Sequence, residues 1–286
     1  MEINSNQQKS ILITGESGFI GRYLSDSYKN QKNINLIKVT RENGFDLNSD
    51  TWVKKLPNIK IDTVIHLAQS NYYNEIPKKA KNLINININS TIDLLEWSKN
   101  NSVKKFIYAS SGNVYSQSRK KLIENSLLGP SSLYGISKLA GEEIVKKYNN
   151  SFDTLIMRIF GVYGPGQKKM LIPEIIKKIK LKNEIFLAQS KGLYFTPIYI
   201  DDLINIIREL INRNFNQKNL VVNICGSEVV SLNDLVKKLE KLINKKAKIK
   251  ITNDEIKYFI GSNELLLKLL NIKDLISLDK GLKLVI

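Results

Sequence analysis

A glycine-spaced turn between a short apolar run and a helical segment limits the fold more than any other feature. Residues 10–14 predict a buried strand, and glycines follow at positions 15, 18 and 21. Glycine permits a tight turn, a close approach of phosphate to backbone N–H groups and close helix packing. The helix dipole then favours phosphate binding. The pattern predicts dinucleotide binding rather than simple turn punctuation, through Gly15, Ser17, Gly18, Phe19, Ile20 and Gly21.

Apolar runs and helical patterns alternate along the first half of the chain. Residues 35–40, 61–67, 103–109 and 152–159 predict further strands, and residues 80–100 predict one long helix. This alternation is typical of βαβ units, which form a parallel sheet with right-handed crossovers. We therefore expect an α/β fold with a Rossmann-type doubly wound parallel sheet and a smaller C-terminal α/β lobe.

A Gly- and Pro-rich segment at residues 161–166 interrupts the alternation. We expect residues 1–165 to form the dinucleotide-binding Rossmann lobe and residues 166–286 the substrate-binding lobe, with some of its segments returning to the first lobe. Amphipathic helices are predicted at residues 172–181, 203–211 and 232–243, and short strands at residues 194–200 and 220–224.

Tyr134 and Lys138 lie four residues apart in a segment with helical spacing, so both project from one helix face. A nearby ammonium lowers the pKa of a phenol toward working pH, and such a Tyr can exchange a proton with a hydroxyl or ketone. Ser111 follows a buried strand and can hydrogen-bond the same oxygen. A solvated helix face gives the same pattern, so the catalytic interpretation depends on a dinucleotide bound alongside.

The end of the second strand bears on the choice of cofactor. An acid there would accept hydrogen bonds from the ribose of NAD, but the sequence has Thr40 and Arg41. Arg41 can pair with a ribose 2′-phosphate, which favours NADP(H), or it is a solvated loop residue. Asp46 can accept from the adenine amino group or cap the following helix.

Composition argues against several other classes. The 44 Lys and Arg against 27 Asp and Glu give a net charge of +17, but the lysines are scattered in pairs, so we predict no nucleic-acid partner. The single cysteine, Cys225, fits a reducing compartment. No apolar run approaches the roughly 20 residues of a membrane helix, and one histidine, His66, cannot build a His-rich metal site. We expect a cytoplasmic protein without a metal or a membrane partner.

Seven segments together resemble the extended short-chain dehydrogenase/reductase superfamily, specifically the NAD-dependent epimerase/dehydratase family that acts on nucleotide sugars. They are Thr-Gly-Glu-Ser-Gly-Phe-Ile-Gly at 14–21, His-Leu-Ala at 66–68, Asn-Ile-Asn-Ser-Thr-Ile-Asp-Leu-Leu-Glu at 87–96, Tyr-Ala-Ser-Ser-Gly-Asn-Val-Tyr at 108–115, Tyr-Gly-Ile-Ser-Lys at 134–138, Arg-Ile-Phe-Gly-Val-Tyr-Gly-Pro-Gly-Gln at 158–167 and Ile-Tyr-Ile-Asp-Asp-Leu at 198–203.

The resemblance implies that Ser111 and Tyr134 contact the reacting hydroxyl and that Lys138 holds the nicotinamide ribose. Asn87 is placed on the helix behind the site. The implied chemistry is hydride transfer between sugar C4 and the nicotinamide. Besides the glycine turn, the expected cofactor-binding residues are Arg41, Asp46, Leu47, Leu67, Ala68, Asn87, Tyr134 and Lys138.

Three departures from the family pattern narrow the reaction and the substrate that the resemblance implies. Family dehydratases carry an Asp-Glu pair where this chain has Gly112 and Asn113, which argues against dehydration because that reaction needs an acid. Many members have a diphosphate-binding Arg where this chain has Thr196, unless Lys168, Lys169 or Lys191 substitutes. The chain also stops at Ile286, near where members continue into a last helix, which implies a trimmed substrate lobe.

We predict an enzyme, an NAD(P)-dependent nucleotide-sugar epimerase or 4-ketoreductase of carbohydrate biosynthesis, with Ser111, Tyr134 and Lys138 as catalytic residues and NADP favoured. One alternative is an NADP-dependent reductase of a carbonyl substrate without a nucleotide. Another is a non-catalytic cofactor-binding scaffold. The resemblance also implies a homodimer formed through the helices around Asn87 and Tyr134.

Overall fold

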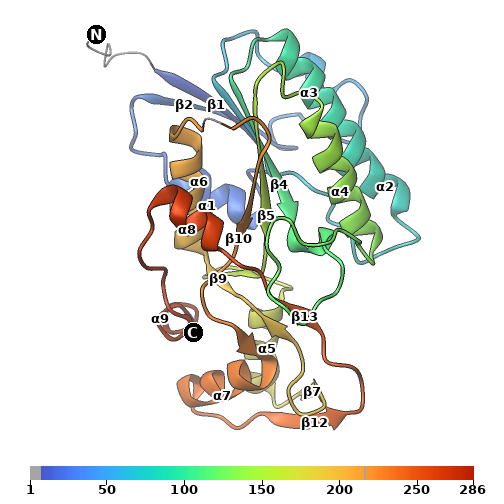
Figure 1. Ribbon diagram of the computed structural model, residues 1–286, viewed down its shortest axis with the longest axis vertical. Coiled ribbons are helices and arrows are strands. Elements are labelled where there is room, and N and C mark those ends of the chain that lie inside the picture. The colour runs from blue at the N-terminus through green and yellow to red at the C-terminus, as the bar shows by residue number, and fades with distance from the viewer. Residues whose placement is uncertain (1–7, 216) are drawn as a thin grey trace. The chain divides into compact units, whose positions relative to one another are not determined.

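The computed structural model describes residues 8–215 and 217–286 (Figure 1). The chain divides into two compact units, each assembled from segments that are separate in the sequence. Unit 1 consists of Met1–Val114, Pro130–Arg158 and Ile207–Val222, and unit 2 of Tyr115–Gly129, Ile159–Ile206 and Asn223–Ile286.

A six-stranded sheet forms the centre of unit 1. Its strands, in spatial order, are β10 (Leu220–Ile224), β5 (Asp153–Ile159), β4 (Lys105–Ser111), β3 (Thr63–His66), β1 (Lys9–Thr14) and β2 (Ile34–Val39). β1 pairs in parallel with β2 and β3, and β3 pairs in parallel with β4. The chain passes from β1 to β2 on one side and returns to β3 on the other. The strand order therefore reverses between β1 and β3, and ligands of open α/β sheets bind beyond the carboxyl ends of strands at such a reversal. The predicted Rossmann-type sheet is confirmed.

Helices cover both faces of this sheet, with α1 on one face and α3 and α4 on the other (Figure 1). The helical elements of unit 1 are α1 (Phe19–Asp26), the 3₁₀ turn η1 (Trp52–Lys55), α2 (Ala80–Ile84), the π turn η2 (Asn85–Asn89), α3 (Ser90–Asn100), the 3₁₀ turn η3 (Gly112–Val114) and α4 (Leu133–Lys146). The Ser132 hydroxyl caps α4 by accepting from the Gly135 N–H at 3.1 Å. The buried core against α3 and α4 includes Trp52, Leu94 and Phe106.

The predicted helix over residues 80–100 is wrong in one respect, because a π turn separates α2 from α3. The backbone hydrogen bonds of a π turn span five residues rather than the four of an α-helix, and a segment of five residues is too short for hydrophobic periodicity to show the difference. The hydroxyls of Ser90 and Thr91 donate to the carbonyls of Ile86 and Asn87, four residues earlier, at 2.7 and 2.9 Å. Single π turns are frequent at functional sites, and this one contains Asn87.

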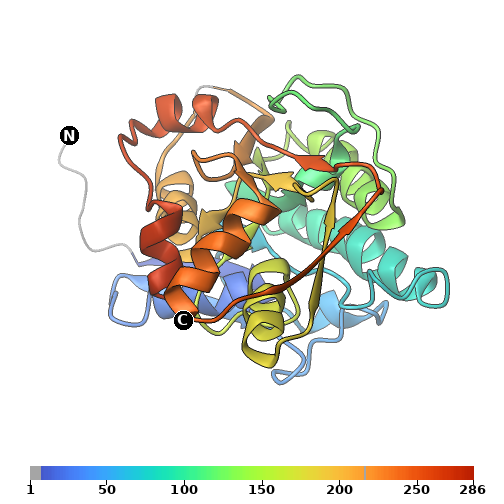
Figure 2. The same ribbon diagram turned by 90° about the horizontal axis from the view of Figure 1, so that it is seen from below.

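Unit 2 combines short strands with amphipathic helices (Figure 2). Its elements are β6 (Val162–Tyr163), α5 (Leu171–Leu181), β7 (Glu184–Ala188), β8 (Tyr194–Phe195), β9 (Ile198–Tyr199), the first part of α6 (Ile200–Asn212), β11 (Val230–Ser231), α7 (Leu232–Ile243), β12 (Lys248–Thr252), β13 (Tyr258–Phe259), α8 (Glu264–Leu270) and α9 (Leu278–Lys283). The helix predicted at residues 232–243 matches α7 at both ends. The parallel pair β7 and β12 was not predicted.

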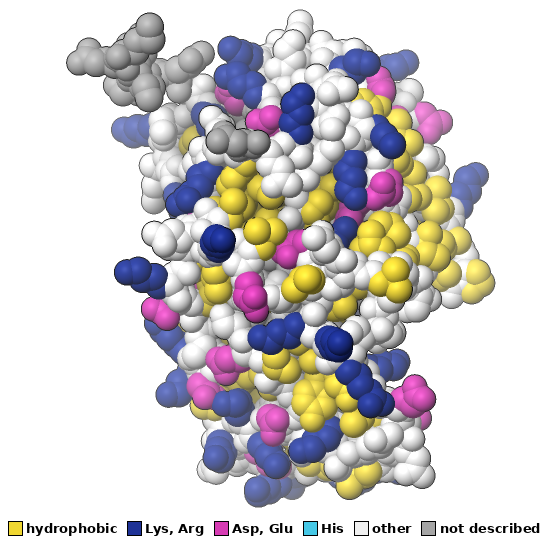
Figure 3. Space-filling model, viewed as in Figure 1, with side chains coloured by type: hydrophobic (Ala, Val, Ile, Leu, Met, Phe, Trp, Pro, Cys, Tyr) yellow, Lys and Arg dark blue, Asp and Glu magenta, His cyan; other side chains and the backbone are white. Residues whose placement is uncertain are grey.

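Cationic side chains are dispersed over the face shown in Figure 3, with acidic ones between them. This distribution agrees with the scattered lysine pairs of the sequence. In the part of the chain that the structure describes, no helix combines the length and the apolar character needed to cross a bilayer.

Candidate functional site

The turns after β1 and β3 meet at the reversal point of the sheet. Gly15 follows β1 with a φ of +74°, which L-residues other than glycine rarely adopt. A Cβ at Gly15 would lie 2.7 Å from the backbone nitrogen of Ala68 and 2.8 Å from the carbonyl carbon of Leu67. The Ala68 N–H also donates to Thr14 Oγ1 at 3.3 Å. The two turns thus form one continuous backbone surface, and only glycine fits at position 15.

The glycine turn presents open backbone donors. The Gly18 N–H donates to the Gly15 carbonyl at 3.0 Å, which closes the turn. Gly18 is the N-cap of α1 and has no side chain, so the first N–H groups of α1 remain available to an anion. A Cβ at Gly21 would lie 2.3 Å from the Gly15 carbonyl oxygen, so α1 can approach this closely only with glycine there. These features fit the phosphates of a dinucleotide. Ser17 is exposed, and Phe19 and Ile20 are half-buried.

The segment after β2 has a cation where NAD-binding proteins carry an acid. Thr40 is buried, and Arg41 is exposed at the start of a turn in which the Gly44 N–H donates to the Arg41 carbonyl at 2.9 Å. Lys38 on β2 forms an ion pair with Glu16 of the glycine turn at 2.8 Å. The lysine therefore offsets the only carboxylate in the glycine turn.

Asp46 and Leu47 have local structural roles. Asp46 is exposed, and its Oδ1 accepts from the Asn48 N–H at 3.1 Å. The next helical turn begins at Trp52 with Thr51 as its N-cap, so Asp46 is not that cap. Leu47 is half-buried against the core. Contact of either residue with an adenine stays a prediction.

His66 joins the two turns to the π turn. Its Nδ1 lies 2.6 Å from Thr14 Oγ1 and its Nε2 lies 2.9 Å from Thr91 Oγ1. Thr91 donates its hydroxyl hydrogen to the Asn87 carbonyl, so it accepts from Nε2–H, and Nδ1 accepts from Thr14. Burial lowers the pKa of His66 to about 3, with the charge of Lys138 as a second cause. His66 is thus a neutral connector of fixed tautomer.

Asn87 uses both ends of its side-chain amide within unit 1. Its Oδ1 accepts from the Ser70 N–H at 2.8 Å, and its Nδ2 donates to Ser137 Oγ at 2.9 Å. Ser137 in turn donates to the Tyr134 carbonyl at 2.8 Å. Asn87 therefore ties the loop after β3 to the first turn of α4. Its expected contact with the cofactor stays a prediction.

The three predicted catalytic side chains come together in unit 1. Tyr134 and Lys138 project from α4, and Ser111 ends β4. The Lys138 Nζ lies 6.0 Å from the centre of the Tyr134 ring and donates to the Ala109 carbonyl at 2.9 Å. The Ser111 hydroxyl hydrogen-bonds Tyr134. The Tyr134 hydroxyl also donates to Gln69 Oε1 at 2.9 Å, a contact that the sequence did not predict.

The predicted direction of the Tyr134 pKa is wrong for this structure. Burial raises the pKa of Tyr134 to about 12, and the hydrogen bond from Ser111 opposes the rise. Burial also lowers the pKa of Lys138 to about 7, and the Glu142 carboxylate opposes that shift. The lysine thus carries only part of a positive charge near neutral pH, and desolvation is the largest influence on the pKa of the Tyr134 phenol.

A buried ion pair lies behind Lys138, one helical turn further along α4. The Glu142 carboxylate accepts from Arg158 Nη2 at 2.7 Å and from Ser110 Oγ at 2.5 Å. All three side chains are buried. Sequence reasoning missed this cluster, although the spacing of four residues between Lys138 and Glu142 was a signal that both face the sheet.

Two of the departures from the family pattern have clear structural roles. Asn113 donates to Ser111 Oγ from both its backbone nitrogen, at 3.2 Å, and its Nδ2, at 3.1 Å. In unit 2, Thr196 is buried, and its Oγ1 accepts from the Gly261 N–H at 3.0 Å. An amide therefore stands where dehydratases carry an acid, and Thr196 faces the interior of its unit.

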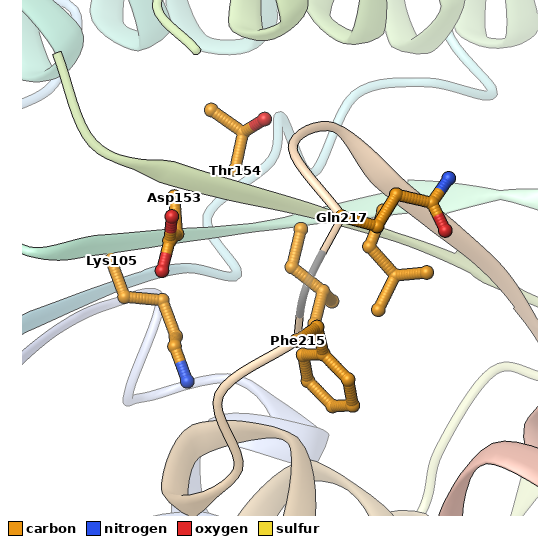
Figure 4. Close-up of a pocket in the computed structure, with 7 residues that line it drawn as sticks. Lys105, Asp153, Thr154, Phe215 and Gln217 are labelled. Carbon is orange, nitrogen blue, oxygen red and sulfur yellow. The ribbon is translucent and has the colours of Figure 1, made fainter. Parts of the chain in front are cut away.

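A small hollow elsewhere in unit 1 has no part in this chemistry (Figure 4). It is lined by Lys105, Asp153, Thr154, Leu155, Phe215, Gln217 and Leu220. Lys105 begins β4 and Ser111 ends it, so the two are about 20 Å apart at ~3.3 Å per residue. The Lys105 Nζ donates to the carbonyls of Leu210 and Ile211 at 3.2 and 3.1 Å, and so caps the end of α6.

Comparisons with known proteins agree with this geometry. The model of the NAD dependent epimerase/dehydratase family matches residues 11–225. A UDP-glucuronate 4-epimerase of Thermodesulfobacterium geofontis is 28% identical over 307 residues, covering 95% of this chain and 93% of its own. A dTDP-4-dehydro-6-deoxyglucose reductase of Escherichia coli is 28% identical over 272 residues, covering 85% and 84%.

Among solved structures, a UDP-glucuronic acid 4-epimerase variant of Bacillus cereus superposes with a TM-score of 0.86. That protein, in complex with UDP-4-deoxy-4-fluoro-glucuronic acid and NAD, is 27% identical, and the match covers 96% of this chain and 97% of the other. The family match spans well over half of the chain, and the fold and the Tyr-Lys geometry agree with it. This chain therefore belongs to the NAD dependent epimerase/dehydratase family.

Proposed function

We propose that this chain is an NAD(P)-dependent nucleotide-sugar 4-epimerase or 4-ketoreductase. The observation that carries the proposal is that one unit holds Ser111, Tyr134 and Lys138 together with the glycine turn. The similar proteins include both an epimerase and a reductase, which supports this reaction class. Turnover of a nucleotide sugar, lost in Tyr134→Phe while cofactor binding persists, is the direct test.

Each group of residues has a separate role in the proposed reaction. The glycine turn and the first N–H groups of α1 hold the cofactor phosphates, and Lys138 holds the nicotinamide ribose. Bound NAD(P) would supply hydride exchange with the sugar carbon. Tyr134 gives a proton to, or takes one from, the oxygen on that carbon, and Ser111 donates to the same oxygen. Asn113 cannot protonate a leaving hydroxyl, which supports epimerisation or reduction over dehydration.

NADP(H) is the cofactor that we favour. Thr40 is buried and Arg41 is exposed directly after β2, so the segment offers a cation to a 2′-phosphate. Fluorescence titration with NADPH and NADH tests this. We expect tighter binding of NADPH and loss of that preference in Arg41→Ala, with the exposed Arg22→Ala of α1 as a control. Tenfold tighter binding of NADH by the unmodified protein would reverse the assignment.

A second candidate is an NADP-dependent reductase of a carbonyl compound that carries no nucleotide. The buried Thr196, whose hydroxyl is already bonded to the Gly261 N–H, favours it, because no charged clamp for a diphosphate stands at that position. A thermal-shift panel of UDP-, dTDP-, GDP- and CDP-sugars separates the candidates, since a ligand of the folded state raises the melting temperature. A shift with one of them supports the first candidate, and no shift with any supports the second.

We also propose that the protein is a cytoplasmic homodimer of carbohydrate biosynthesis. The single cysteine supports a reducing compartment. Ile92 on α3 and Ile136 on α4 are 37% and 48% exposed, and hydrophobic side chains gather in Figure 3 on the side where Figure 1 places α2 and α4. Light scattering after size exclusion should give twice the chain mass, and Ile136→Asp should reduce it to the mass of one chain.

A further inference from the structure

The Tyr134 hydroxyl has a partner outside the expected catalytic trio. It donates to Gln69 Oε1 at 2.9 Å, and Gln69 lies 65 residues earlier, in the loop after β3. The Gln69 side chain is exposed, so its carboxamide has room to turn. Tyr134 is partly exposed on the same side.

The backbone on both sides of Gln69 is fixed. The Ala68 N–H donates to Thr14 Oγ1 at 3.3 Å, and the Ser70 N–H donates to Asn87 Oδ1 at 2.8 Å. Ser70 is buried, and its hydroxyl donates to Asn82 Oδ1 at 2.7 Å. Gln69 thus has an exposed side chain between two buried, anchored neighbours. Its contact with Tyr134 is set by the fold rather than by chance on a loose surface.

The hydrogen bonds around Tyr134 run in one direction. Asn113 donates twice to Ser111 Oγ, so the Ser111 hydrogen is free to point at the Tyr134 oxygen. Tyr134 then gives its own hydrogen to Gln69. This order suits a protonated Tyr134 only. When Tyr134 loses its proton, a carbonyl oxygen in the same place would repel the phenolate.

A carboxamide resolves this conflict because it carries an acceptor and a donor on one rotatable group. We propose that Gln69 is a positioning residue for proton transfer: its Oε1 accepts from the Tyr134 phenol, and after the carboxamide turns, its Nε2–H donates to the Tyr134 phenolate. In reduction, bound NAD(P)H would supply the hydride to the carbonyl carbon. The Tyr134 hydrogen turns from Gln69 Oε1 to the substrate oxygen, the O–H bond breaks as the proton moves to that oxygen, and Gln69 Nε2–H then donates to the remaining phenolate. Oxidation reverses these steps.

Because the carboxamide can rotate, Gln69 is expected to shift the pKa of Tyr134 in one direction. A hydrogen bond to a charged group is roughly twice as strong as one between neutral groups. The donor contact with the phenolate therefore outweighs the acceptor contact with the phenol. Gln69 thus lowers the proton affinity of Tyr134, and its removal raises it.

Ultraviolet difference titration of tyrosinate, each variant measured against the same variant carrying Tyr134→Phe, isolates Tyr134 from the other tyrosines. We expect the Tyr134 titration to move to higher pH in Gln69→Leu, which removes both contacts. In Gln69→Glu, we expect a larger rise of about one unit or more, because a like charge disfavours the phenolate. Gln8→Glu is the matched control, since Gln8 is an exposed residue of unit 1 at the opposite end of β1.

A Gln69→Leu titration at lower pH than wild type would overturn the proposal, because Gln69 would then act as a fixed acceptor. If Tyr134 titrated at the same pH in Gln69→Leu, in Gln69→Glu and in the Gln8→Glu control, the proposal would be overturned as well. The catalytic consequence rests on the proposed function, and the pH profile of kcat/KM should move with the titration in each variant. Absence of turnover with every nucleotide sugar would count against the proposed function alone, since the titration needs no substrate.

Discussion

Arg158 and Glu142 form a buried, forked ion pair: Arg158 Nη2 lies 2.7 Å from Glu142 Oε2, and Arg158 Nε lies 3.0 Å from Oε1. Glu142 also accepts the hydroxyl hydrogen of Ser110, the residue before Ser111. The ion pair joins β5 to α4, the helix that carries Tyr134, and the Ser110 hydrogen bond joins the carboxyl end of β4 to the same helix.

Removing one partner of this pair should destabilise the protein strongly. Glu142→Ala leaves the Arg158 guanidinium buried without its carboxylate, and we expect a loss of about 3–5 kcal/mol in the free energy of unfolding by urea. Asp26→Ala is the control, because the Lys29–Asp26 pair is exposed and should contribute less than about 1 kcal/mol. The double variant Glu142→Met, Arg158→Met should recover much of the loss. Equal losses for Glu142→Ala and Asp26→Ala would contradict the structural role.

Tyr134→Phe should lower kcat by about 10²–10⁴-fold, the usual effect of a positioned acid or base. The ring remains in place, so we expect NAD(P)H binding, followed by nicotinamide fluorescence, to stay close to that of the wild type. Tyr148→Phe serves as the matched control, because the Tyr148 hydroxyl bonds to Glu96 rather than to the site. Unchanged turnover in Tyr134→Phe would point to a different mechanism or to a non-catalytic protein.

Stability should rise with pH above neutrality because of Lys138. The pKa of Lys138 is lowered from its ordinary value of 10.5 to about 7 by burial. Between pH 7 and 10.5 the unfolded chain therefore binds more protons than the folded one, and the free energy of unfolding gains up to about 1.4 kcal/mol per pH unit from this group. Urea denaturation at several pH values should show this slope in the wild type and a smaller one in Lys138→Met. Identical slopes would mean that Lys138 is charged in the folded state.

His66 should make the fold sensitive to acid. Burial lowers its pKa from 6.5 to about 3, so the folded state holds the imidazole neutral where the unfolded state protonates it. The stability that His66 contributes is complete above pH 6.5 and falls as the pH drops toward 3. We expect His66→Gln to be less stable at pH 7, since it disturbs the contacts with Thr14 and Thr91, but to lose less stability between pH 6.5 and 4. A His66→Gln curve parallel to that of the wild type would refute this.

Gly15→Ala should abolish cofactor binding and lower the melting temperature. Alanine at a φ of +74° is strained by about 1–2 kcal/mol, and its Cβ would lie 2.7 Å from the Ala68 nitrogen. Gly166→Ala is a close control, since Gly166 has a φ of +75° and open space around it. We expect Gly166→Ala to lower the melting temperature only by the effect of the backbone strain and to retain NAD(P)H binding. Equal behaviour of the two variants would argue against the close contact of the turns.

The sequence predicted the strands of unit 1 well because buried parallel strands are continuous apolar runs, as in β1 and β10. It also predicted α7, whose apolar residues recur at helical spacing. β12 was missed because Lys248, Ile249, Lys250 and Ile251 are all exposed and no buried face marked the strand.

The grouping of Ser111, Tyr134 and Lys138 was predictable because the spacing of Tyr134 and Lys138 is local and the motif resembles a known family, while their catalytic role stays a prediction. The contact between Gln69 and Tyr134 was not, because a hydrogen bond across 65 residues leaves no periodic trace. The predicted direction of the Tyr134 pKa was wrong for a related reason. The desolvation that raises it depends on how closely folded segments surround the ring, and a spacing of four residues carries no such information.

The last strand of the central sheet, β10, lies at Leu220–Ile224, after about half of unit 2 has been encoded. During synthesis on the ribosome, β5 therefore remains an edge strand without its outer neighbour while about sixty further residues are added. At ~5–20 residues per second this interval lasts several seconds, a period in which the nascent chain exposes unpaired backbone groups.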